Sequence, residues 1–135
     1  TLAKALHHEG LSVAGDPAIS FTETHQVIVE VGYGKGIEAA RKLEENNIIV
    51  NYQASPREEG FTASGCLRLG VSELTRFGMK EPEMVEIAGL MADLVLRGTE
   101  VREKVTALKG KFTDLRFQFT DKETSDGLLK LRSLI

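Results

Sequence analysis

Residues 82–97 constrain the fold more than any other part of the sequence. Apolar residues recur there at helical spacing and form one continuous stripe, namely Met84, Ile87, Ala88, Met91, Leu94 and Val95. Pro82 suits the first turn of a helix, and Gly98 suits its end. Because a helix with such a stripe must bury it against a second layer, the sequence predicts a helix over 82–97 within a layered domain.

Short strand-like runs alternate with helical segments along the rest of the chain. The clearest is 25–31, where every second residue from Val27 to Val31 is valine. Further strands are predicted at 11–14, 48–52 and 66–71, and further helices at 2–8, 37–45 and 99–109. The tail combines a strand-like alternation with a leucine-rich helical pattern, in Leu115, Phe117, Phe119, Leu128, Leu129, Leu131 and Leu134. This order predicts a two-layer α+β sandwich.

The composition excludes several classes of protein. The 135 residues suit one domain, and the net charge of -3 offers no basic excess for a nucleic-acid partner. No apolar run is long enough to span a membrane, and the first residues do not form a secretory signal. The single cysteine permits no internal disulfide, which suits a reducing compartment, so we expect a cytoplasmic protein.

Two candidate sites have little support from the sequence pattern. The glycine-rich turn at 32–36 lies between a predicted strand and a predicted helix, but it lacks the residues of both the dinucleotide and the P-loop fingerprints. The three histidines, at positions 7, 8 and 25, have no metal-ligand spacing, so we predict no metal site.

Arg68 is the most informative single residue. It lies between Leu67 and Leu69 in an otherwise apolar run, so in a strand its side chain points away from theirs. A guanidinium at such a position is either a surface arginine or a bidentate receptor for a carboxylate. The neighbouring Cys66 is either a nucleophile or, more commonly, a small core residue.

Several motifs give this chain a resemblance to a known family. The segment TETHQVIVEV (22–31) resembles the strand of serine hydroxymethyltransferases in which a T-x-N/S-H pattern precedes an apolar run. GIEAARKLE (36–44) and IIVN (48–51) resemble the family's G-x-E-A-x-x-x-L-E helix and the I-x-V-N strand after it. SGCLRLG (64–70) is similar to T-S-G-I/L-R-I/L-G, and LTRFGMKEPEM (74–84) is similar to A-L-T-x-R-G-F/M-x-E-x-E-M. The motifs follow one another in the family's order.

The resemblance implies a fold-type I enzyme that uses pyridoxal 5'-phosphate and transfers one carbon between serine and glycine, with tetrahydrofolate as cosubstrate. Residues 1–135 would form its C-terminal small domain, a small, mostly antiparallel sheet covered by helices. Arg68 matches the arginine that grips the α-carboxylate of the amino-acid substrate. The family's Schiff-base lysine lies in a large cofactor-binding domain outside this chain. The isolated chain is therefore expected to be inactive, and the complete enzyme to be a homodimer or larger.

Departures from the family pattern leave the substrate open. Two residues separate the glycine of the SGCLRLG motif from Arg68, where the family usually has one. The family's folate or substrate loop corresponds to Asn51, Tyr52 and Gln53, and the tyrosine replaces a frequent lysine. Two enzyme hypotheses therefore remain open. One is folate-dependent transfer of one carbon between serine and glycine, and the other is a related aldolase or transaldolase for β-hydroxy-α-amino acids. A stand-alone α+β module that binds a ligand or a partner is the third hypothesis.

Overall fold

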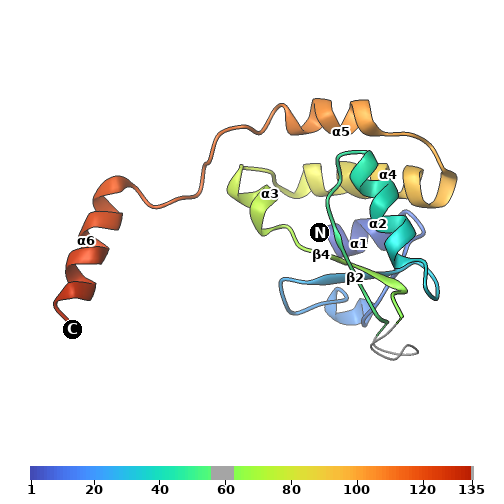
Figure 1. Cartoon of the computed structure of the whole chain (residues 1–135), viewed down its shortest axis with the longest axis horizontal. Coiled ribbons are helices and arrows are strands. Elements are labelled where there is room, and N and C mark those ends of the chain that lie inside the picture. Colours follow the sequence, from blue (N-terminus) through green and yellow to red (C-terminus); the bar gives the residue numbers. More distant parts are fainter. Residues whose placement is uncertain (56–62, 135) are drawn as a thin grey trace.

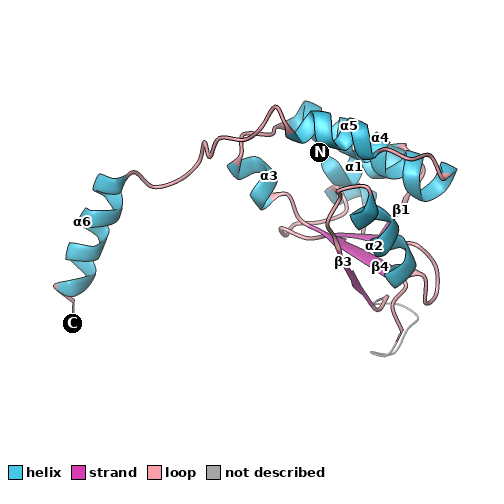
Figure 2. Ribbon diagram, turned by 45° about the horizontal axis from the view of Figure 1, so that its top comes forward, coloured by secondary structure: helices cyan, strands magenta, loops and turns pink. Residues whose placement is uncertain are grey.

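A four-stranded antiparallel sheet, with helices covering one of its faces, forms the centre of the computed structural model, which describes residues 1–55 and 63–134 (Figures 1 and 2). The strands are β1 (Ser12–Val13), β2 (Val27–Glu30), β3 (Asn51–Gln53) and β4 (Cys66–Leu69). The helices are α1 (Leu2–His8), α2 (Gly36–Glu45), α3 (Ser72–Arg76), α4 (Glu81–Arg97), α5 (Arg102–Lys109) and α6 (Asp121–Arg132), with a short 3₁₀ helix, η1 (Pro17–Ile19). The predicted α+β class is confirmed.

The sheet has the order β1-β2-β4-β3, so β2 and β4 are its central strands. Val29 pairs with Leu67, and Val27 pairs with Leu69. All four of these side chains are buried, because successive residues of a strand point to opposite faces and this face meets the helices. The alternate residues of these strands, among them Arg68, lie on the other face of the sheet.

Helix α4 is the central helix of the helical layer, and its bounds agree closely with those of the predicted helix. Its start is fixed by a hydrogen bond of 2.7 Å from the Lys80 backbone N–H to Glu83 Oε2, and its end by Gly98 in the left-handed conformation. Within its apolar stripe, Ile87 and Val95 are half-buried at the edges and the other members are buried. Helix α4 packs against α1, α2 and α5, which joins the two halves of the chain.

Three predictions about local structure need correction. Residues 48–50 were predicted as strand, but β3 begins only at Asn51, because it pairs with β4 alone and only over three residues. Helix α3 was not predicted, since five residues carry too little periodicity to detect. The alternating residues of 115–119 form no strand, because in the described parts of the chain no neighbouring strand pairs with them.

Within the described ranges, no helix is both long and apolar enough to cross a membrane. Helix α6 stands apart from the rest of the molecule at the end of an extended connection (Figure 1). All of its residues are exposed.

Asn46 joins two elements that are distant in sequence. Its side chain is 7% exposed and lies directly after α2. Its Oδ1 accepts a hydrogen bond of 2.9 Å from the backbone N–H of Val101, at the start of α5, and its Nδ2 donates to the carbonyl of Lys42 at 3.0 Å. Each partner would otherwise be an unsatisfied backbone group, and such a group is costly when it is buried.

We therefore expect Asn46→Ala to lower the free energy of unfolding by about 2 kcal/mol. Urea denaturation of the chain measures this change, and Glu45→Ala, at an exposed neighbour in α2, serves as the control. An equal effect of the two substitutions would show that the Asn46 hydrogen bonds do not stabilise the fold.

Candidate functional site

Arg68 lies on the central strand β4, with β2 on one side and β3 on the other. Leu67 and Leu69 are buried beneath the helices, whereas Arg68 is exposed on the opposite face, as the alternation predicted. Its neighbours in register are Ile28 on β2 and Asn51 on β3. Because strands hold β4 on both sides, the backbone that carries this guanidinium is fixed.

The Arg68 guanidinium has no carboxylate partner among the described residues. Two described arginines form ion pairs: Arg76 lies 3.7 Å from Glu73, and Arg97 contacts Asp93 at 2.7 Å and Glu9 at 3.3 Å, contacts that raise the pKa of Arg97. An exposed guanidinium that no described residue neutralises is available to a carboxylate from outside the domain.

The residues predicted as one loop, Asn51, Tyr52 and Gln53, form the edge strand β3. Asn51 pairs in register with Arg68 and Gln53 pairs with Cys66, so both share the face of Arg68. Tyr52 pairs with Leu67 and therefore lies on the other face, where it is 50% exposed at the sheet edge. The geometry groups Asn51 and Gln53 with Arg68 and separates Tyr52 from them.

A cavity of about 270 Å³ adjoins Arg68 and Asn51. Leu74, Ile87 and Met91 contribute an apolar wall from α3 and α4. Because the side chains of Arg68 and Asn51 point away from the helical layer, their guanidinium and amide lie on the opposite face from this wall, where they can hold a carboxylate that approaches from outside the domain.

Sequence reasoning missed the pairing of Asn51 with Arg68 and the contribution of α3 and α4 to the cavity wall. Both residues were placed on strands, but only the register makes them neighbours. Register between strands far apart in sequence depends on the whole core, so no local motif indicates it.

Other candidate residues lie away from this cavity. Cys66 is fully buried, which agrees with the core interpretation. The described residues contain no group of three or more histidine, cysteine or acidic side chains that could hold a metal ion. Every lysine of the chain is among the described residues and is exposed.

No family model matches the sequence. Individual proteins do match it: the serine hydroxymethyltransferase of Pyrobaculum aerophilum is 42% identical over 93% of this chain, and that of Sulfolobus acidocaldarius is 39% identical over 99% of it. The chain spans only 30% and 32% of the length of these relatives.

The fold of this chain also resembles part of a larger protein of known structure. The L-threonine transaldolase of Pseudomonas fluorescens superposes on 81% of this chain with a TM-score of 0.69 and 35% sequence identity. The match covers 24% of the transaldolase chain. In both comparisons, therefore, this domain corresponds to a minor part of a larger protein.

Proposed function

We propose that this chain is the small domain of a serine hydroxymethyltransferase-like enzyme and that it supplies the substrate-carboxylate clamp of that enzyme; its similarity in sequence to such enzymes and in fold to a transaldolase supports the proposal. In this proposal residues 1–135 are the C-terminal small domain, and the complete enzyme transfers one carbon between serine and glycine. Tetrahydrofolate is the proposed cosubstrate, and a cytoplasmic homodimer or larger assembly is the proposed form.

The observation that carries the proposal is the Arg68 guanidinium, which has no carboxylate partner among the described residues and lies beside Asn51 on a fixed central strand. The fork of N–H donors can bind both oxygens of an α-carboxylate, and the Asn51 amide can donate a further hydrogen bond. Two parallel hydrogen bonds fix the orientation of the carboxylate as well as its position.

Orientation is the contribution that this domain makes to catalysis. An amino acid held by its carboxylate can present one chosen bond at its α-carbon to the reacting groups, and positioning of this kind lowers the barrier without any proton transfer by the clamp.

The residues of this chain do not fit the role of holding pyridoxal 5'-phosphate. A Schiff-base lysine is normally activated in a desolvated pocket or beside another cation. Each lysine of this chain is exposed instead. We therefore assign cofactor binding to the part of the enzyme outside this chain, and derive no step that involves the cofactor.

A related transaldolase is the alternative, and the superposition on L-threonine transaldolase is the observation that favours it. The clamp would serve both enzymes equally, because serine and β-hydroxy-α-amino acids share the α-carboxylate. The difference lies in the group that accepts the released carbon fragment.

We expect the complete enzyme, meaning the polypeptide that joins this chain to its cofactor-binding part, to convert serine into glycine only when tetrahydrofolate is present. Glycine formation with and without the folate measures this dependence, and threonine with an added aldehyde is the comparison substrate. Folate-independent exchange of threonine, without turnover of serine, would contradict the transferase function and support the transaldolase.

A further inference from the structure

Helix α3 is held in place only in part by its own residues. None of its five residues is buried, and Leu74, its one apolar residue, packs half-buried against the core. A helix of five residues has almost no stability of its own in water, so α3 depends on contacts with other parts of the chain. Leu74 also lines the cavity that adjoins Arg68 and Asn51, so whatever holds α3 holds one wall of this cavity.

The carbonyl groups at the end of α3 show which other part of the chain holds it. The last four carbonyls of a helix have no partner within the helix. The turn that follows α3, residues 77–79, donates its three backbone N–H groups to the carbonyls of residues 73–75 over distances of 2.8 to 3.2 Å. The fourth carbonyl, that of Arg76, accepts from the backbone N–H groups of Arg116 at 2.9 Å and of Phe117 at 3.3 Å. A segment from beyond α5 therefore completes the last turn of α3.

A second contact joins the same two segments. Gly78 has a φ of +94°, the left-handed conformation that commonly ends a helix. A Cβ added to Gly78 would lie 3.0 Å from Cδ and 3.1 Å from Cγ of Arg116. The stem of the Arg116 side chain thus lies over the space that the glycine leaves open. We call residues 113–117 the strap, because they cross from the end of α5 to the end of α3.

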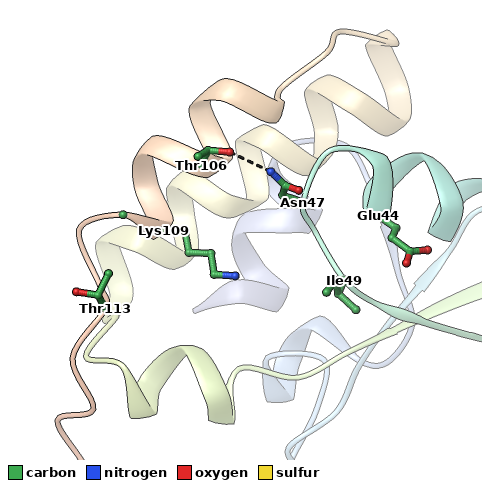
Figure 3. Close-up of a pocket in the computed structure, with 7 residues that line it drawn as sticks. Glu44, Asn47, Ile49, Thr106, Lys109 and Thr113 are labelled. Carbon is green, nitrogen blue, oxygen red and sulfur yellow. Dashed lines mark hydrogen bonds between the residues drawn. The ribbon is translucent and has the colours of Figure 1, made fainter.

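The strap is anchored firmly at its start and weakly along its length. Just before it, Phe112 packs half-buried against the core, and Asn47 donates a hydrogen bond of 3.0 Å to Thr106 in α5. Figure 3 shows this bond, and Thr113 just beyond the end of α5, where the strap begins. All five residues of the strap are exposed, Phe117 by 61%. An exposed segment that is tied down by backbone hydrogen bonds belongs to the low-stability part of a fold.

We propose that the strap and α3 open and close as one unit while the rest of the domain stays folded. In the closed form the strap completes the last turn of α3, and Leu74 closes one side of the cavity of about 270 Å³. When the strap leaves, the Arg76 carbonyl loses both of its donors and Gly78 loses its contact with Arg116. Helix α3 then loosens, and the cavity opens on the side of Leu74. This inference concerns contacts within the domain, so it does not depend on the proposed function.

Amide hydrogen exchange of the full chain, followed by mass spectrometry, tests the strap. Arg116→Pro removes the N–H that makes the shorter of the two bonds to the Arg76 carbonyl. The control is Asp114→Pro, which changes the same exposed segment but leaves both N–H donors in place. We expect peptides that cover residues 72–79 to exchange about tenfold faster in Arg116→Pro, since hydrogen bonds that close the helix are lost. Exchange in α4 should stay unchanged, and Asp114→Pro should exchange like the wild type.

Two truncations separate the strap from α6. A chain that ends at Phe117 lacks α6 but keeps the strap, and a chain that ends at Phe112 lacks both. Residues 72–79 should exchange as in the full chain in the first truncation and about tenfold faster in the second. Wild-type exchange of residues 72–79 in Arg116→Pro or in the shorter chain would overturn the proposal. Equal acceleration in α4 would also overturn it, because the whole domain rather than one unit would then be opening.

Discussion

Replacing Arg68 with alanine in the complete enzyme will lower kcat/KM for the amino-acid substrate by about 100-fold, while the cofactor stays bound. The loss of one partner of a bidentate, charge-assisted hydrogen-bond pair costs on the order of 3 kcal/mol, which corresponds to this factor. Arg68→Lys should recover only part of the rate, since an ammonium keeps the charge but not the two-pronged geometry. Steady-state kinetics and the cofactor's absorbance measure the two effects separately.

The matched control is Arg102→Ala, which removes an exposed arginine from α5. Substrate analogues without the α-carboxylate add a second comparison, because wild type and Arg68→Ala should turn them over at similar rates. An unchanged kcat/KM for the natural substrate in Arg68→Ala would eliminate the clamp, whatever the reaction of the enzyme is.

A methyl group at Gly15 will destabilise the fold more than any surface substitution. Gly15 has a φ of +118°, and an added Cβ would lie 2.0 Å from the carbonyl oxygen of Phe21. That carbonyl belongs to backbone fixed by a hydrogen bond of 2.8 Å from the Phe21 N–H to Asp16, and the Phe21 ring is buried against His7. We expect Gly15→Ala to lower the free energy of unfolding by roughly 3 kcal/mol or more.

Gly98→Ala is the control for Gly15→Ala, because it carries the cost of a left-handed backbone without the steric clash. Gly98 also has a positive φ, of +69°, but its added Cβ would meet nothing within 4 Å. It should therefore cost only about 1 kcal/mol. Urea denaturation of both variants gives the comparison, and equal losses would show that the loop around Phe21 yields to the methyl group.

Local signals account for what the sequence predicted well. The limits of α4 follow from Pro82, Gly98 and the spacing of its apolar stripe, all within one segment. The orientation of Arg68 follows from its two leucine neighbours in the same way. Such features need no knowledge of the rest of the fold.

Features that depend on contacts between distant parts of the chain could not be predicted from the sequence. The neighbourhood of Asn51 and Arg68 depends on the register of β3 against β4. The alternation of Leu115, Phe117 and Phe119 would have suited a strand, but a strand also needs a partner, and the sequence pattern cannot supply one. The separation of α6 from the domain has the same origin, since amphipathicity shows that a helix must pack but not where.

The position of the two clamp residues in the sheet has a consequence for how such enzymes diversify. Arg68 is anchored on a strand with neighbours on both sides, so its backbone cannot shift without disturbing β2 and β3. Asn51 and Gln53 lie on the edge strand, which pairs on one side only among the residues the structure describes, and substitutions there disturb the fold least. We expect relatives with new substrates to have diverged along β3 while the carboxylate anchor stayed in place, so laboratory evolution of specificity should begin at positions 51 and 53.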